Sequence, residues 1–118
     1  MRVKINPTDK LFSQYMRLKS KGICERCGQY KGYTHLQVSH FHGRRKRNTR
    51  WDEENCCVLC MGCHMYLHAN PSEHVKFFQE RLGQQAFDKL NIRAQFRHKV
   101  DEPAVILYLR EKLKELEL

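Results

Sequence analysis

Two pairs of cysteines constrain this chain more than any other feature of its sequence. Two residues separate Cys24 from Cys27, and two separate Cys60 from Cys63. This spacing lets both thiolates of a pair bind one Zn²⁺, so that two pairs supply the four corners of a tetrahedron. Four thiolates leave no position for water. We therefore expect a structural zinc that joins two segments of the chain and takes no part in chemistry.

The six cysteines also allow other arrangements. Disulfides would need an oxidising compartment, but the N-terminal MRVKINPTDK lacks the apolar stretch of a secretory signal, and histidines accompany the cysteines. Cys57 and Cys60 also have metal-binding spacing. In the interpretation that we favour, Cys56 and Cys57 are buried thiols on a short strand. The expected location of the protein is the cytoplasm.

Charge indicates a polyanionic partner. The 118 residues carry a formal net charge of +9, and the sequence pI is about 9.5. Much of that charge falls in one loop, which we expect to bind phosphates. The alternative interpretations of this loop are a solvated segment and a localisation-like basic run. The predicted phosphate-binding residues of this loop are Arg44, Arg45, Lys46, Arg47 and Arg50. The longest apolar run, AVILYL, is too short to cross a bilayer, so the predicted partner is DNA and not a membrane.

The hydrophobic pattern predicts one domain, residues 1–118, with helices at both ends. Apolar residues recur at helical spacing in 8–20 and again through the helical part, 72–118. The intervening 23–69 contains glycines, aromatics and the cysteine pairs, and favours short strands before one helix. The predicted N-cap residues are Thr8 or Asp9, Ser72 and Asp101.

Several histidines lie at positions that suit chemistry. His64 and His68 are one helical turn apart, so both can bind one metal ion, although a histidine that only satisfies a core contact fits the same pattern. His40 lies on a predicted strand, and His42 would share its face if the strand continues that far. Asn55 lies between the basic loop and the second cysteine pair.

The segments SHFHGR and LCMGCHMYLH, with Asn55 between them, resemble the HNH endonucleases. The resemblance extends from Cys24 to about His68, and the two C-x2-C knuckles are similar to those of phage and bacterial members. The serine-histidine-phenylalanine start is closest to recombination-associated phage members. The implied fold class is α+β: a small ββα-metal (His-Me finger) core, stapled by the four-cysteine zinc site, with flanking N- and C-terminal helices.

The same resemblance implies a role for each residue. His40 becomes the general base, and Asn55 orients it or tightens the loop. His64 and His68 become ligands of a catalytic divalent cation, which is Mg²⁺, Mn²⁺, Ni²⁺ or Zn²⁺. Ser39 stands where the family often has an acidic or histidine ligand, so the third ligand is left open between water, the Ser39 hydroxyl and His42.

The function expected from these features is a metal-dependent DNA endonuclease that hydrolyses phosphodiester bonds, nicking or cutting its substrate. The alternatives are a catalytically weak or inactive zinc-stabilised DNA-binding module and a structural zinc ribbon for protein contacts. The expected partners are DNA and other phage or recombination proteins, inside a phage-infected or bacterial cell. The sequence leaves open whether the protein is a monomer or a dimer.

The remaining aromatic and histidine residues have structural interpretations. Trp51 is able to stack on a base, but packing beside a turn is the interpretation that we favour. His35, His74 and His98 lack partners at ligand spacing and are expected to be structural or surface residues. The leucines near the C-terminus are expected to pack onto the domain, with an oligomer interface as the alternative.

Overall fold

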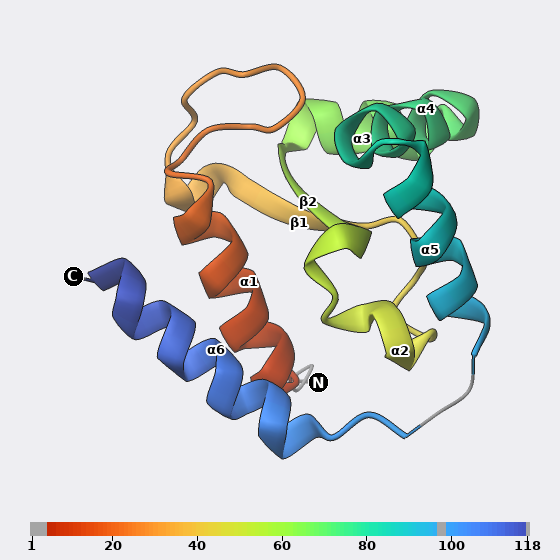
Figure 1. The fold of residues 1–118 in the computed structure, drawn as a ribbon. Coiled ribbons are helices and arrows are strands. Elements are labelled where there is room, and N and C mark those ends of the chain that lie inside the picture. The colour runs from red at the N-terminus through yellow and green to blue at the C-terminus, as the bar shows by residue number, and fades with distance from the viewer. Residues whose placement is uncertain (1–4, 97–98, 118) are drawn as a thin grey trace, which may run out of the picture.

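The computed structural model describes residues 5–96 and 99–117, which form a mixed α+β fold (Figure 1). The elements of these residues are α1 (Pro7–Lys19), a 3-10 turn (Tyr33–His35), β1 (Leu36–His40), α2 (Arg47–Arg50), a second 3-10 turn (Glu53–Asn55), β2 (Cys56–Cys60), α3 (Met61–Ala69), α4 (Pro71–Leu82), α5 (Gln84–Gln95) and α6 (Glu102–Glu117). The expected helices at both ends and the short strands between them are present. None of the described helices is long and apolar enough to cross a membrane.

The two strands form an antiparallel ribbon at the centre of the molecule. Leu36 of β1 lies opposite Cys60 of β2, and His40 lies opposite Cys56. The first four residues of β2 are buried, because protein covers both faces of this strand, as its unbroken apolar run predicts. Cys56 and Cys57 are therefore buried thiols, as expected.

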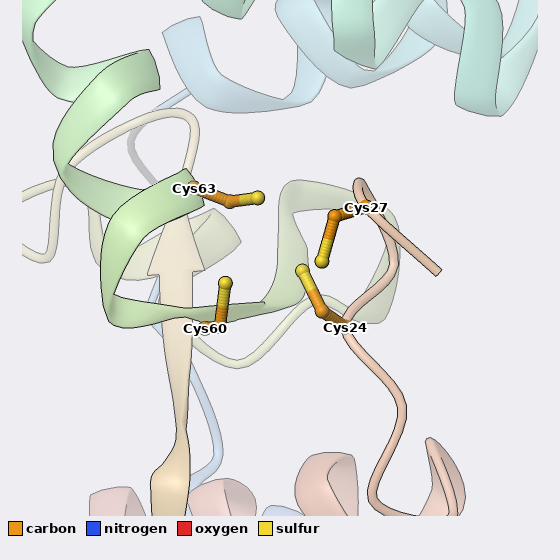
Figure 2. A group of neighbouring side chains, drawn as sticks. All are labelled: Cys24, Cys27, Cys60 and Cys63. Carbon is orange, nitrogen blue, oxygen red and sulfur yellow. The ribbon is translucent and has the colours of Figure 1, made fainter. Parts of the chain in front are cut away.

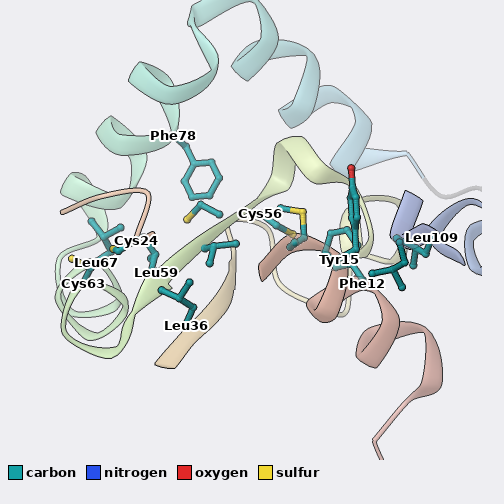
Figure 3. Close-up of a cluster of buried hydrophobic side chains, with 14 of the residues drawn as sticks. Phe12, Tyr15, Cys24, Leu36, Cys56, Leu59, Cys63, Leu67, Phe78 and Leu109 are labelled. Atoms are coloured by element: carbon teal, nitrogen blue, oxygen red, sulfur yellow. The ribbon is translucent and has the colours of Figure 1, made fainter. Parts of the chain in front are cut away.

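Helices pack on both sides of the ribbon. In Figure 1, α1 and α6 lie side by side below it, and α3 and α4 lie above it. Figure 3 shows the core that results, with Phe12 of α1 close to Leu109 of α6 at one end and Phe78 of α4 at the other. Leu109 and Leu113 are both buried, so α6 packs onto the rest of the fold as expected, whereas Leu107 and Leu116 are exposed.

Helix α1 begins one residue earlier than expected, and its N-cap is Asn6. The Asn6 side chain accepts hydrogen bonds from the backbone N–H of Thr8 (2.8 Å) and Asp9 (3.1 Å). Neither Thr8 nor Asp9 is the cap. The reason is Pro7, which fits the first helical position because its missing N–H would have no partner there.

The same effect moves the start of α4. Pro71 occupies its first turn, so Asn70 is the cap residue and the predicted cap Ser72 lies inside the helix. Gly83 ends α4 with a φ of +85°, a conformation that favours glycine. The Asp101 cap of α6 is confirmed, because its carboxylate accepts from the backbone N–H of Ala104 at 3.1 Å.

Candidate metal centre and histidine groove

The four predicted zinc ligands come together in the structure. The sulfur atoms of Cys24, Cys27, Cys60 and Cys63 all lie within 4.8 Å of one another. Figure 2 shows these four side chains converging from the loop after α1, the end of β2 and the first turn of α3. The arrangement fits one structural metal ion, as the spacing predicts. Cys57 is buried in the ribbon instead, which rules out the alternative pair of Cys57 with Cys60.

The pKa values of these thiols show why the cluster needs a cation. Burial acts to raise the pKa of Cys24, but hydrogen bonds from the backbone N–H groups of Cys27 and Cys60 outweigh it and lower the pKa to about 6. Burial raises the pKa of Cys63 to about 12, and the neighbouring Cys60 and Cys24 act in the same direction. Close thiolates repel one another, so all four ionise together only around a positive ion.

Glu25 ties the Cys24–Cys27 turn to β2 independently of any metal. Its backbone N–H donates to the Val58 carbonyl oxygen at 2.9 Å. Its carboxylate accepts from the Val58 backbone N–H and, at 3.0 Å, from Nε of Arg81 on α4. The turn, the ribbon and α4 are thus linked by hydrogen bonds as well as by the cysteines.

His40 ends β1 and is half-buried beside Phe12 of α1. Its Nε2 lies 2.9 Å from the carbonyl oxygen of Arg50. A carbonyl oxygen only accepts, so Nε2 carries the hydrogen and the lone pair is on Nδ1. Burial lowers the pKa of His40, the Arg50 carbonyl acts to raise it, and the charge of Arg44 lowers it further. The imidazole is therefore neutral at pH 7, with an acceptor nitrogen.

A groove of about 380 Å³ runs between α1 and β1, and His40 forms part of its wall. Arg17 and Arg44 also line this groove, and so does Gln37. Arg44 is exposed, whereas the Arg17 guanidinium lies over the Tyr33 ring at 4.1 Å. Asp9 lines the groove as well, but its carboxylate is paired with Arg50. The groove therefore combines a neutral histidine with two arginines and one paired carboxylate.

His64 and His68 lie on α3 as the sequence predicts. Nδ1 of His64 is 2.6 Å from Oε1 of Gln37, the residue that also lines the groove. The amide oxygen accepts the Nδ1 hydrogen, which leaves the Nε2 lone pair free for a metal ion. His68 is exposed one turn later. Within 5–96 and 99–117, the four cysteines are the only group of three or more possible histidine, cysteine or acidic ligands. Among these described residues, no third ligand of these types is therefore grouped with His64 and His68.

The two protein candidates for a third ligand have other partners. Ser39 is buried and lies opposite Cys57 in the ribbon. His42 lies beyond the end of β1, and its Nε2 is 2.8 Å from Oδ1 of Asn91 on α5. The expectation that His40 and His42 share one face of a strand is wrong, because β1 ends at His40 and the chain then turns toward α5.

Asn55 holds the long loop between the strands. Its side chain is fully buried, and Nδ2 donates to the backbone carbonyls of His42 and Thr49, both at 2.9 Å. Oδ1 accepts from the backbone N–H of His42 at 2.8 Å. These bonds all go to loop backbone. Of the two roles expected of Asn55, the structure therefore places it where it tightens the loop.

The cations of the basic loop divide into those with an ion pair and those without one in the described structure. Arg50 forms a two-bond ion pair with Asp9, at 3.0 and 2.5 Å, and Trp51 donates to the same carboxylate at 2.9 Å. Trp51 therefore has the packing role that we favoured. Arg47 lies 3.7 Å from Glu102. The residues of the loop that are exposed and without an ion pair in the described structure are Arg44, Arg45 and Lys46.

Three other residues near these sites were not expected there. Gln37 and Arg17 contribute to the groove, but only the strand register and the packing of α1 show this. His74 of α4 packs against Phe41 and Phe78, with ring centroids 5.2 and 5.3 Å apart, and its buried Nε2 has no hydrogen-bond partner in the described structure. His35 is exposed, as expected, and His98 lies outside the described residues.

Comparison with known proteins corrects the family that the motifs resembled. The family model described as Bacteriophage Lambda NinG protein matches residues 2–118, nearly the whole chain. The resemblance to the HNH endonucleases is therefore wrong as an assignment of family, and it rested on short motifs within 24–68. The ββα-metal core that it implied is not confirmed, although β1, β2 and α3 follow one another in the chain. No curated protein and no solved structure matches the chain.

Proposed function

The chain belongs to the NinG family of bacteriophage lambda, and we propose that it is a metal-dependent hydrolase of DNA phosphodiester bonds. The observation that carries this proposal is the state of His40. It is neutral, fixed through Nε2 by the Arg50 carbonyl, and placed on the wall of a groove that also holds two arginines. A general base needs a free lone pair near its substrate, and Nδ1 has one.

In this proposal each groove residue has a different role in hydrolysis. Arg17 and Arg44 bind the phosphate oxygens and hold the scissile phosphorus beside His40. Nδ1 of His40 removes a proton from water as the water oxygen bonds to phosphorus. The bond from phosphorus to the leaving oxygen then breaks, and that oxygen takes a proton from solvent.

His64 and His68 are the residues that hold the divalent cation in this proposal. A cation bound there supplies positive charge for the phosphate and the leaving oxygen. Gln37 supports the fit, because its contact with Nδ1 orients His64 and presents Nε2. Gln37 is the residue common to both, since it contacts His64 and also lines the groove.

Relaxation of supercoiled plasmid tests the proposal. The protein is incubated with Mg²⁺, Mn²⁺, Ni²⁺ or Zn²⁺, each added singly, with unsupplemented protein as the blank. We expect nicking with at least one ion, and a loss of about 10²–10⁴-fold in rate for His40→Ala. The matched control is His35→Ala, which removes an exposed histidine outside the groove and should cleave at the wild-type rate.

The pH profile adds an independent reading of His40. Because its folded pKa lies below the ordinary value of 6.5, the base stays neutral down to that lower pKa, and cleavage should decline only below it. A rate that already declines between pH 8 and 7, or full activity of His40→Ala, would rule out His40 as the base.

One observation favours a second candidate, a zinc-stabilised DNA-binding module without catalysis. The histidine pair offers two protein ligands, while Ser39 is buried and His42 contacts Asn91. This module would bind DNA through the basic loop but show no cleavage with any ion. The plasmid assay beside a gel-shift assay separates the two candidates.

We also propose that the protein acts on phage DNA during recombination, in the cytoplasm of the infected cell. The NinG match supports this setting, and the net charge of +9 supports binding to DNA. Reconstitution with phage recombination proteins would test it, since a true partner should alter the cleavage rate.

A further inference from the structure

We propose that Phe96 and the basic loop form a second nucleic-acid site, which binds an unpaired nucleotide by stacking its base on the Phe96 ring. The site lies away from the histidine groove and is not needed for hydrolysis. The proposal rests on the proposed function only in taking DNA as the partner.

The site is an open pocket of about 680 Å³ between the basic loop and the end of α5. Arg45, Lys46 and Arg47 line one side, and Phe96 lies on the other. The two sides are held together by Asn48, whose Nδ2 donates to the Arg93 carbonyl at 3.3 Å. The pocket is thus a built part of the fold.

Arg93 makes the α5 side of this pocket rigid. Its guanidinium donates to Asp52 and to Glu54, both at 2.9 Å. These bonds fasten the last turn of α5 to the segment that follows the basic loop. Phe96, the C-cap of α5, donates its backbone N–H to the Arg93 carbonyl, and its exposed side chain lines the pocket.

Phe96 is the residue that indicates a ligand. It is 62% exposed and has no aromatic neighbour among the described residues. An exposed phenyl ring beside three cations contributes little to stability, but it suits a nucleobase, which presents an aromatic face and carries a phosphate. Stacking of one base on an aromatic side chain contributes about 1–3 kcal/mol.

The pocket favours DNA whose bases are not paired. In a duplex the faces of the bases are covered by their neighbours, so Phe96 is able to stack only on a base that has left the helix. None of the described residues that line the pocket is acidic, and Arg45 and Lys46 have no ion pair there and can bind the adjoining phosphates. Arg47 is partly engaged by Glu102 and contributes less.

The basic loop connects this pocket with the histidine groove. Arg44 lines the groove, whereas the next three residues line the pocket. A strand that crosses the loop therefore meets His40 on one side and Phe96 on the other. The inferred substrate is DNA with unpaired nucleotides close to the position that His40 faces.

Binding of fluorescent oligonucleotides tests the site apart from cleavage. The measurements use His40→Ala protein without added divalent cation, and compare a single-stranded oligonucleotide that contains 2-aminopurine with its duplex. We expect Phe96→Ala to weaken single-strand binding about tenfold and to remove the stacking quench of 2-aminopurine. Duplex binding should change by less than about twofold, because phosphate contacts dominate it.

Two further variants make the result specific. Phe96→Trp should restore both affinity and quenching, since the indole also stacks. Ile92→Ala, which removes a 54% exposed apolar side chain one turn earlier on α5, should change neither. Equal losses for single strand and duplex, or no loss for Phe96→Ala, would overturn the stacking site. A protein that binds single strands through Phe96 but never cleaves would retain this site while the hydrolase proposal fails.

Discussion

The cysteine centre and the histidine groove contain similar ligand types, but the structure completes only one of them. The four cysteine sulfurs lie within 4.8 Å of one another and satisfy a metal ion among themselves. In the proposed catalytic site His64 and His68 would supply two ligands, and His40 lines a separate groove that shares Gln37 with His64. A closed set of ligands suits a structural role, whereas an incomplete set leaves positions for water and substrate.

The difference also lies in what holds each region. The ligands of the cysteine centre lie on two short chain segments, one for each C-x2-C pair. The centre depends on its metal to balance the charge of the thiolates. The groove depends on buried polar groups in the long loop, above all Asn55 and the Asp9–Arg50 pair. Each region should therefore fail in a different way, and four changes separate them.

Removal of one zinc ligand should have the largest effect. Cys60→Ser leaves three thiolates, and because structural zinc contributes about 10–16 kcal/mol in small domains, more than most folds have in reserve, the protein should lose metal and unfold. Metal content and a circular dichroism melt measure this. Cys56→Ala is the control: it removes a buried thiol outside the centre and should retain one metal ion. Normal melting of metal-free Cys60→Ser would contradict the structural role.

Asn55→Ala should damage the groove and spare the cysteine centre. It leaves the His42 N–H and the His42 and Thr49 carbonyls without their partner, which should cost about 3 kcal/mol of unfolding free energy. Urea denaturation measures the loss, and metal content should remain unchanged. Asn91→Ala removes a single bond to His42 and should cost about 1 kcal/mol. Equal costs for the two variants would mean that Asn55 does not close the loop.

Asp9→Asn should remove one pH-dependent part of stability. Burial acts to raise the Asp9 pKa, but hydrogen bonds from Arg50 and Trp51 hold it below its ordinary value of 3.8. Its contribution is therefore present above pH 3.8 and is lost as the pH falls through the lower, folded pKa. The variant should be about 2 kcal/mol less stable at pH 7, and the gap should close as the pH falls below 3.8 and through the lower, folded pKa. Urea midpoints give this difference, and a constant gap would exclude Asp9 as its source.

Loss of the exposed loop cations should have the smallest effect on the fold and a clear one on DNA binding. Replacing Arg44, Arg45 and Lys46 with alanine should reduce the slope of log K against log salt by about 0.9 for each phosphate contact removed. Fluorescence anisotropy at several salt concentrations measures the slope. The control replaces Arg110, Lys112 and Lys114 of α6, which removes the same charge at a different place. An equal reduction in the control would mean that total charge, and not the loop, binds DNA.

The cysteine centre was predictable because the spacing of residues close together in the sequence determines each pair of ligands. A C-x2-C turn determines where two thiolates point, and helical periodicity located α1 and α3 through α6. Two errors have a local cause: Pro7 and Pro71 take the first helical position, so the caps are Asn6 and Asn70, two positions before Thr8 and Ser72. The other errors arose where a distant residue decides: Asn55 binds the loop backbone at His42, and Asp9 of α1 pairs with Arg50.

The groove was only partly predictable for the same reason. His40 and Asn55 were identified from a motif, but Arg17 and Gln37 carry no motif and join the site through packing. In the sequence, Phe96 looks like any other apolar residue at the end of a helix. Only its exposure beside the basic loop distinguishes it from a core residue. The motif also suggested the wrong family, because a few residues within 24–68 matched a pattern while the whole chain matches NinG.

The bonds between Glu25 and Val58 have a consequence for how this protein behaves when it loses its metal. β2 pairs with β1 along one edge, and Glu25 occupies hydrogen-bonding groups on the other, so a very apolar strand offers little template for pairing with another chain. The Cys24–Cys27 turn carries Glu25, and release of the metal leaves these hydrogen bonds alone to hold the turn against β2. Apo protein should therefore self-associate through β2 and scatter light before it unfolds completely, which makes the metal a guard against aggregation.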